Sequence, residues 1–437
     1  MSFIADKQTL EDLNLLGKYR PHSILGIFHQ TKTAGGGRLL ESMFNNPLTE
    51  AEAINKRTGV FRYFQRMRLK FPFSADAIGK VENYLSMGMG SNALATMAGV
   101  VRKKLLSAVV RDERYHLLYE GFLATVETLR VLAEFLRQLE GSVEHPYQKR
   151  IQELKAFFAD RRLTGMLQEE GMSLLKVAKY DHLLKNRFGA EMEVVLDVIY
   201  ELDLYISVAD VARARDFSYA VGYPKGHNIF RAEGLRHPGL DMAVGNPLNL
   251  YRESNIVFLT GANMAGKSTF MKSFGIAVYL AHMGFPVAAK EMEFSVRDGL
   301  YSSINVPDNL NLGYSHFYAE VLRVKTVAKE VSRGKHLIVL FDELFKGTNV
   351  KDAYDATLAV TQAFSEYRNC FFIISTHIIE VGEVLKQRCD NLQFSYLPTV
   401  MEGPVPRYTY RLAAGITNDR HGMMIIENER ILEIILQ

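Results

Sequence analysis

The segment Asn255–Met283 reads NIVFLTGANMAGKSTFMKSFGIAVYLAHM. Its first part, Ile256–Thr260, is a short apolar run that predicts a buried strand, and its last part predicts an apolar helix. Between them, Gly261–Thr269 (GANMAGKST) fits the spacing G-x-x-x-x-G-K-[ST] of a phosphate-binding loop, in the strand–loop–helix setting that this pattern requires. The segment therefore predicts an α/β unit built around a nucleotide site.

The loop also predicts how a nucleotide would be held. Gly261 and Gly266 allow tight turns, so that successive backbone amides and the start of the next helix can face phosphate oxygens. Lys267 would neutralise charge on the β- and γ-phosphates, and Ser268 would bind Mg²⁺. We therefore expect ATP and Mg²⁺ as cofactors, with nucleotide contacts from the whole loop: Gly261, Ala262, Asn263, Met264, Ala265, Gly266, Lys267, Ser268 and Thr269.

A second apolar run, LIVLFDE over Leu337–Glu343, ends in two carboxylates. Alone, such an ending is as typical of a helix start as of a functional site, but downstream of a phosphate-binding loop it indicates the metal and water site of an ATPase. Asp342 would hold Mg²⁺ through its water shell. Glu343 would polarise the attacking water, because hydrolysis needs an oriented nucleophile in line with the leaving group.

A third apolar run, Cys370–Ser375, leads into Ser375–His377 (STH). A lone histidine at a strand end is commonly structural, but its place after the two earlier motifs favours a sensor of the γ-phosphate. In open α/β sheets ligands bind beyond the carboxyl ends of the strands. We therefore expect the three polar clusters to meet at one site, with Glu343 and His377 among its catalytic residues.

Before about residue 220 the sequence predicts helices. Two runs have apolar residues at three- and four-residue steps, so each predicts a long amphipathic helix, and the two could pack as a lever. Residues 148–188 between them predict shorter helices. The two stripes are Leu118, Phe122, Val126, Leu129, Ala133, Leu136 and Leu139, which Gly141 and Pro146 follow, and Val195, Ile199, Leu202, Ile206 and Ala209.

Composition limits the kinds of protein that this chain can be, but it does not identify a function. With 437 residues, of which 48% are hydrophobic, the chain can form two or three structural units. Two cysteines and no apolar run of membrane-spanning length predict a cytoplasmic protein without a membrane partner. A net charge of +3 does not establish nucleic-acid binding. The clusters Arg66, Arg68, Lys70 and Arg102, Lys103, Lys104 could contact phosphates or be solvated helix faces.

These residues resemble the MutS family beyond the phosphate-binding motifs. Five segments occur here in the same order as in the family. They are RHPGL (Arg236–Leu240), NPLNL (Asn246–Leu250), GANMAGKST, GYSHFYAEV (Gly313–Val321) and DELFKGTN (Asp342–Asn349). The resemblance implies that Ser315 reaches the γ-phosphate of a partner subunit and so acts in trans, and Phe317 and Glu320 fit the same segment. The LSGGQ of transport ATPases is absent, and the acidic pair of many relatives is Asp308 and Asn309 here.

The resemblance extends upstream, through Leu25–Arg57 and Tyr200–Ala212, to the family's lever domain. It implies the fold class α plus α/β: a helical lever like MutS domain III over residues 1–220, then an ABC-type P-loop ATPase domain like MutS domain V, with a mostly parallel sheet, over 221–437. It also implies a homodimer through the ATPase domain, in which the levers pass the nucleotide state to clamps around DNA.

The sequence departs from the family in several places. The lever begins near residue 25, which leaves no room for the mismatch reader, and the Phe-x-Glu triplets at Phe341 and Phe364 lie inside the ATPase domain. About 50 residues separate the long helices, so the clamp is expected to be absent or reduced. Alanines 262 and 265 replace the usual Pro and third Gly, Lys346 replaces an Arg, and Ala243 stands where some relatives stack an aromatic ring on adenine. We expect neither an extended helical tail nor an Smr module after the ATPase domain.

Three hypotheses follow from the sequence. The first is a MutS-like ATPase that couples ATP hydrolysis to DNA binding in repair or recombination, with partner repair proteins that the sequence does not identify. The second is a nucleotide-gated scaffold that binds protein or ribosomal RNA and not DNA. The third is a metabolic kinase, which the missing acceptor pocket disfavours.

Overall fold

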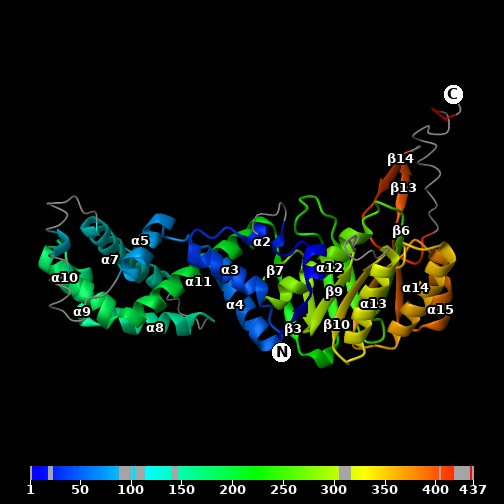
Figure 1. The fold of residues 1–437 in the computed structure, drawn as a ribbon, viewed down its shortest axis with the longest axis horizontal. Helices are drawn as coiled ribbons and strands as arrows, with labels where there is room; N and C mark the ends of the chain where they lie inside the picture. The colour runs from blue at the N-terminus through cyan, green and yellow to red at the C-terminus, as the bar shows by residue number, and fades with distance from the viewer. Residues whose placement is uncertain are drawn as a thin grey trace. The chain divides into compact units, whose positions relative to one another are not determined.

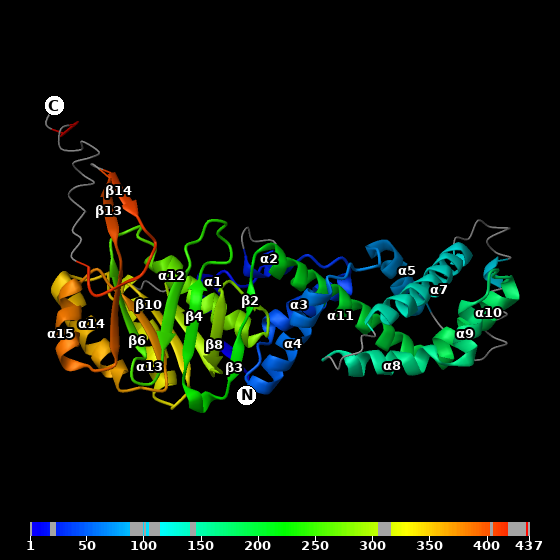
Figure 2. The ribbon, with the colours of Figure 1, turned by 180° about the vertical axis from the view of Figure 1, so that it is seen from behind.

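Residues 2–17, 23–87, 99, 102–104, 114–139, 146–304, 316–402, 405–417 and 434–435 are described by a computed structural model of the chain. The chain divides into two compact units (Figures 1 and 2). One unit comprises Met1–Phe28, Met43–Thr58 and Val211–Gln437, and the other comprises His29–Ser42 and Gly59–Asp210. This division differs from the predicted boundary at residue 220. The first strand of the chain, Ile4–Ala5, pairs with Gly299 and Leu300 and so belongs to the sheet of the C-terminal residues.

The helical unit confirms both predicted long helices. The apolar stripes place most of their residues in one core, in which Phe122, Leu129 and Leu202 are fully buried. Shorter helices over residues 148–187 complete that core, as predicted. The elements are α5 (Ala75–Ser86), α7 (Arg114–Leu139), α8 (Gln148–Phe158), α9 (Arg161–Leu167), α10 (Leu174–His182), the π-helix η1 (Leu183–Arg187) and α11 (Gly189–Ala214). The helices α3 (Ala34–Asn45), α4 (Ala51–Met67) and α11 include residues of both units.

A buried carboxylate fixes the start of α3 in the helical unit. Asp203 on α11 accepts hydrogen bonds from the backbone N–H groups of Lys32 and Thr33 and from the Thr33 hydroxyl, at 2.7–3.0 Å. The Thr33 hydroxyl in turn accepts from the backbone N–H of Gly36 at 3.0 Å. These bonds satisfy N–H groups that have no partner inside a helix, so they hold the polar turn before α3 in place.

The α/β unit is built on a seven-stranded sheet with the order β1-β9-β10-β11-β6-β12-β15. Neighbouring strands are parallel except at β12 and β15, so the sheet is mostly parallel, as predicted. The three predicted strands are confirmed to within one residue. The strands are β1 (Ile4–Ala5), β6 (Ile256–Gly261), β9 (Gly299–Ser303), β10 (Leu337–Asp342), β11 (Phe371–Ser375), β12 (Leu392–Leu397) and β15 (Ala413–Ala414).

Helices connect the parallel strands of this sheet. They are α12 (Lys267–His282), α13 (His316–Val331), α14 (Val350–Ser365) and α15 (Ile379–Arg388), with α1 (Lys7–Asp12) and α2 (Ile24–Phe28) near the start of the chain (Figure 1). Strands β6, β10 and β11 are almost fully buried, which explains why they read as continuous apolar runs and not as alternating ones. Within the described residues, no helix combines the length and the hydrophobicity that membrane crossing demands.

The α/β unit also contains smaller sheets. A four-stranded sheet has the order β3-β8-β4-β5, and two ribbons pair β2 with β7 and β13 with β14. Their strands are β2 (Ser218–Tyr219), β3 (Val221–Tyr223), β4 (Phe230–Leu235), β5 (Asn246–Leu250), β7 (Pro286–Val287), β8 (Glu291–Ser295), β13 (Thr399–Glu402) and β14 (Val405–Tyr408), and the short 3₁₀-helix η2 is Lys225–His227.

Candidate functional site

The three predicted polar clusters lie at one edge of the main sheet. Strand β11 lies between β6 and β10 and is parallel to both, so the carboxyl ends of all three strands point the same way. Lys267 follows β6, the pair Asp342 and Glu343 ends β10, and His377 follows β11. The fold therefore brings together the residues that the sequence placed at one ligand site.

The backbone of the loop after β6 adopts conformations that its glycines permit. Gly261 has φ +145° and Gly266 has φ +103°, which are conformations that residues with a Cβ rarely adopt. Helix α12 begins at Lys267 directly after this turn, so its first backbone N–H groups have no partner within the helix. With 16 residues, α12 is long enough for these N–H groups and the helix dipole to favour an anion.

Lys267 points into this loop. Its Nζ donates to the carbonyl oxygens of Gly261 at 2.9 Å and Ala262 at 3.2 Å, and the residue is only 4% exposed. Burial lowers the pKa of Lys267, and the charges of Glu343 and Asp342 oppose that shift. Only β11 separates β6 from β10 in the sheet, so Lys267 and the two carboxylates lie at the same edge.

Ser375 at the end of β11 organises the two carboxylates. Its hydroxyl donates to Asp342 Oδ1 and accepts from the backbone N–H of Glu343 at 3.2 Å. The same N–H also donates to the Ser375 carbonyl oxygen at 3.0 Å. Glu343 has φ +54°, a left-handed conformation that is uncommon for a residue with a side chain and that these bonds stabilise.

His377 contacts the second carboxylate. Its Nε2 lies 2.5 Å from Glu343 Oε1. This hydrogen bond is the main cause that lowers the pKa of Glu343, with burial acting in the opposite direction. The ionised Glu343 is therefore a hydrogen-bond acceptor that His377 holds in one orientation. The predicted role of His377 as a γ-phosphate sensor remains a prediction.

The donor set at this edge fits Mg²⁺. The ion prefers oxygen ligands and keeps several waters, so it needs only one or two protein oxygens besides those of a phosphate. Ser268 and Asp342 supply a hydroxyl and a carboxylate. Within the described residues, no group of three or more His, Cys, Asp or Glu side chains could hold a metal ion, so a site made wholly of such side chains is not found there.

Ser315, predicted to act in trans, lies outside the described residues, as do Asp308 and Asn309. The first described residues after it begin α13. Phe317 packs against Phe345, with ring centroids 6.1 Å apart, and a Cβ on Gly347 would lie 2.8 Å from the backbone nitrogen of Phe317. The two segments Gly313–Val321 and Asp342–Asn349 are thus in contact through their described parts, and Gly347 is needed for their close approach.

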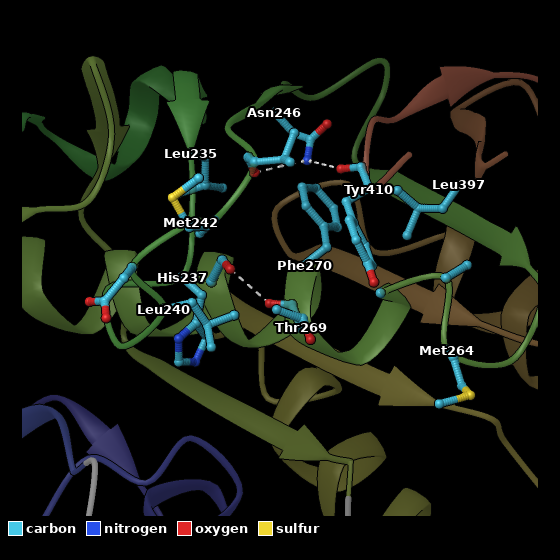
Figure 3. A pocket seen from close by; sticks show the side chains of 16 residues that line it. Leu235, His237, Leu240, Met242, Asn246, Met264, Thr269, Phe270, Leu397 and Tyr410 are labelled. Atoms are coloured by element: carbon cyan, nitrogen blue, oxygen red, sulfur yellow. Dashed lines mark hydrogen bonds between the residues drawn. The ribbon is translucent and has the colours of Figure 1, made fainter. Parts of the chain in front are cut away.

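A pocket of about 430 Å³ lies beside the loop (Figure 3). Asn246 closes it on one side: its Nδ2 donates to the Tyr410 carbonyl oxygen at 2.9 Å, and its Oδ1 accepts from the backbone N–H of Leu412 at 2.7 Å. The lining residues are Leu235, His237, Leu240, Asp241, Met242, Ala243, Val244, Asn246, Met264, Ala265, Gly266, Thr269, Phe270, Ser273, Leu397 and Tyr410. The pocket is therefore mainly apolar and adjoins the loop that begins α12.

Tyr410 is a pocket residue that the sequence did not predict. A Cβ on Gly266 would lie 3.1 Å from Tyr410 Cδ1, so the ring packs on the loop. Tyr410 is 46% exposed, and its side chain lines the pocket (Figure 3). His237 on the other side is neutral at pH 7, because burial lowers its pKa to about 4. Ala243, which the sequence placed where some relatives stack an aromatic ring, lines the pocket.

The fold and the site together define a class of protein: a helical unit joined to an α/β unit whose parallel strands carry a glycine-turned loop, a carboxylate pair and a histidine at one edge. Two family models match the chain, that of MutS domain III over residues 8–209 and that of MutS domain V over residues 257–437. The chain belongs to the MutS family.

Several curated MutS proteins are similar to this chain in sequence. The DNA mismatch repair protein MutS of Leuconostoc mesenteroides is 23% identical over 521 aligned positions, which cover 97% of this chain and 60% of that protein. A MutS protein of Thermus thermophilus is 33% identical over 48% of this chain and 25% of its own length. That of Petrotoga mobilis is 26% identical over 59% of this chain and 32% of its own length. The chain thus spans less than two thirds of the length of these relatives.

Proposed function

We propose that this chain binds ATP with Mg²⁺, hydrolyses it, and couples the reaction to DNA in repair or recombination. The observation that carries this proposal is the arrangement at the sheet edge, where the glycine-turned loop with buried Lys267 lies at the same strand ends as Asp342 and Glu343. A buried cation next to two carboxylates and a free helix N-terminus suits a metal-bound polyphosphate.

Each residue at the edge has a task in hydrolysis. The amides of the loop and Lys267 would hold the phosphates, and Ser268 and Asp342 would hold Mg²⁺, which supplies charge stabilisation on the transferred phosphoryl group. Glu343 would accept a hydrogen bond from the attacking water, in the orientation that His377 fixes. Ser315 of a partner subunit would complete the site, which makes a homodimer through the α/β unit the active form.

The apolar pocket beside the loop is proposed to hold the base. Tyr410 offers a ring face for stacking, and Phe270 lies at the same pocket. Ala243 also lines the pocket and adds no ring there, so base affinity rests mainly on Tyr410. The phosphates then contribute a larger share of the binding free energy than in a site with two rings.

Coupling to DNA is proposed from the names of the relatives, which are DNA mismatch repair proteins. The alignment with the Leuconostoc protein runs over 521 positions, more than the 437 residues of this chain, so that protein has residues within the aligned span that this chain lacks. This supports a reduced clamp in the helical unit.

Two measurements test the proposal. Nucleotide affinity and phosphate release are compared for the wild-type protein, Lys267→Ala and the matched control Lys386→Ala, which changes an exposed lysine on α15. We expect Lys267→Ala to weaken ATP binding about 10- to 100-fold, since it removes charge-assisted bonds to phosphate, and Lys386→Ala to leave it unchanged. Equal affinity in all three proteins would contradict the site.

The second measurement compares the ATPase rate with and without duplex DNA, branched DNA and RNA across salt concentrations. Stimulation by DNA forms with a steep salt dependence supports the coupling. Stimulation by RNA alone, or by no polymer, would instead favour the nucleotide-gated scaffold. Phosphate release without an added acceptor would exclude a kinase.

A further inference from the structure

Ser375 is a polar residue at the end of an otherwise apolar strand. It follows residues 371–374 of β11 and is fully buried. In the sheet it pairs in register with Leu259 of β6 on one side and with Asp342 of β10 on the other. A buried hydroxyl lowers stability unless it is hydrogen-bonded, and an apolar residue at this position would avoid that cost. The hydrogen-bond partners of this hydroxyl indicate what it does.

The hydroxyl gives its proton to one carboxylate oxygen of Asp342. It donates to Oδ1, which lies on the neighbouring strand end. A serine hydroxyl has one proton to donate, whereas a carboxylate has two acceptor oxygens. The bond to Oδ1 therefore restricts rotation of the carboxylate and leaves Oδ2 for a metal ion or its water shell. Mg²⁺ keeps several of its waters, so one carboxylate oxygen from this residue is sufficient.

The same hydroxyl accepts a hydrogen bond from the residue after Asp342. The Glu343 N–H donates to Ser375 Oγ at 3.2 Å and to the Ser375 carbonyl oxygen at 3.0 Å. Glu343 has φ +54°, so the backbone leaves the extended conformation directly after Asp342. One serine thus holds the side chain of the first carboxylate and the main chain of the second. The orientation of Asp342 and the turn at Glu343 are linked through a single hydroxyl.

We propose that Ser375 is a positioning residue of the ATPase site: it reserves Asp342 Oδ2 for Mg²⁺ and links that carboxylate to the backbone turn that places Glu343. The proposal deepens the proposed function and rests on it. Loss of the hydroxyl should weaken both metal binding and turnover. Binding of the phosphates themselves should persist, because Lys267 and the loop before α12 make no hydrogen bond to this hydroxyl.

Two variants remove the hydroxyl and should leave the fold intact. In Ser375→Ala the Glu343 N–H keeps its bond to the carbonyl oxygen of residue 375, and water can replace the lost donor at Asp342, which is partly exposed. Ser375→Cys keeps nearly the same volume but is only a weak donor, and it is read in place of the alanine variant if that protein does not fold. Ser365→Ala is the matched control, since Ser365 is also buried and its hydroxyl donates to the Gln362 carbonyl oxygen at 2.7 Å.

The experiment measures three quantities in the wild-type protein, both variants and the control. They are ADP affinity without a divalent ion, binding of Mn²⁺ to the protein–ADP complex from the loss of the free-ion EPR signal, and kcat at saturating ATP and Mg²⁺. In both Ser375 variants, ADP affinity should stay within about twofold of wild type. Mn²⁺ affinity and kcat should each fall about 10-fold or more, as is typical when a residue that orients a metal ligand is removed. Ser365→Ala should match wild type in all three.

Several outcomes would overturn the inference. They are wild-type Mn²⁺ affinity in Ser375→Ala, wild-type kcat in that variant, or an equal loss of metal-free ADP affinity, which would mean that the change disturbs the phosphate loop. Wild-type behaviour of Ser375→Cys would show that volume matters and not the hydrogen bond. The wild-type protein separates the two claims. If it binds no ADP or releases no phosphate from ATP, the proposed function itself fails; if it does both, the variants decide the role of Ser375 alone.

Discussion

His377 Nε2 lies 2.5 Å from Glu343 Oε1, so the histidine after β11 and the carboxylate after β10 form one hydrogen-bonded pair across two neighbouring strands. The role proposed for Glu343, to orient water, needs a fixed geometry and a carboxylate that stays ionised. The pair supplies both, because the His377 hydrogen bond lowers the pKa of Glu343 against the opposing effect of burial.

Replacing His377 should therefore change the pH dependence as well as the rate. In His377→Ala the main cause of the lowered pKa of Glu343 is gone and burial remains, so that pKa rises. We expect the acid limb of the kcat–pH profile to move to higher pH, and kcat at pH 7.5 to fall about 100-fold, with ATP affinity nearly unchanged. A kcat–pH profile with an unmoved acid limb and a lower plateau would contradict the role of His377 in lowering the pKa of Glu343.

Replacing Tyr410 should weaken binding of the nucleotide's adenine base and leave binding of its phosphates unchanged. Tyr410→Ala removes the ring that packs on Gly266, and stacking of a base on an aromatic ring contributes about 1–3 kcal/mol, so ATP affinity should fall about 10-fold or more. Tyr410→Phe keeps the ring and serves as the control. The affinity for inorganic triphosphate, measured by competition, should be the same in all three proteins. Equal losses for ATP and triphosphate would mean that Tyr410 shapes the loop itself.

The sequence predicted those parts of the site that lie in one short segment each. The loop 261–269, the carboxylates after β10 and the histidine after β11 carry their own local signals, a glycine spacing or a polar cluster after a buried strand. Because parallel strands end at a common edge, their convergence also followed from the sequence. The long helices α7 and α11 were predictable for the same reason, since their stripes repeat at helical period.

Other parts of the site depend on contacts between distant residues and carry no local signal. Tyr410 reaches the loop because Asn246, 164 positions earlier in the chain, holds its carbonyl group. The N-terminal residues belong to the α/β unit because β1 adds to the sheet beside β9, and a two-residue strand has no period to detect. The His377 contact to Glu343 likewise depends on the order of strands, which the sequence did not reveal.

His282 should make the α/β unit sensitive to acid. It is fully buried: its Nδ1 lies 2.7 Å from the Leu48 carbonyl oxygen, and its Nε2 lies 3.2 Å from the backbone nitrogen of Arg297. The first nitrogen therefore carries the proton and the second accepts, so a further proton would break the Arg297 bond. Burial is the main cause that lowers the pKa of His282 to about 4.

The sign of the pH effect follows from that depressed pKa. The unfolded chain takes up the proton near pH 6.5 and the folded chain only near pH 4, so the stabilising contribution is complete above pH 6.5 and is lost between these values. The free energy of unfolding should fall by up to about 1.4 kcal/mol per pH unit in this window from this residue. Urea unfolding from pH 7 to 4 measures the slope, which His282→Asn should flatten and exposed His227→Asn should not. Identical slopes in all three proteins would contradict this assignment.

Asp203 should contribute strongly to the stability of the helical unit. Its carboxylate accepts from Lys32 and Thr33, and a Cβ on Gly36 would lie 2.6 Å from its Oδ2, so the turn before α3 packs closely against it. Asp203→Asn removes the charge and turns an NH₂ group toward N–H donors, which should lower the free energy of unfolding by about 3 kcal/mol. Asp197→Asn, the same change at an exposed position of α11, should cost less than about 0.5 kcal/mol. Urea unfolding compares the two proteins, and similar values would show that the Asp203 bonds contribute no more than a surface contact.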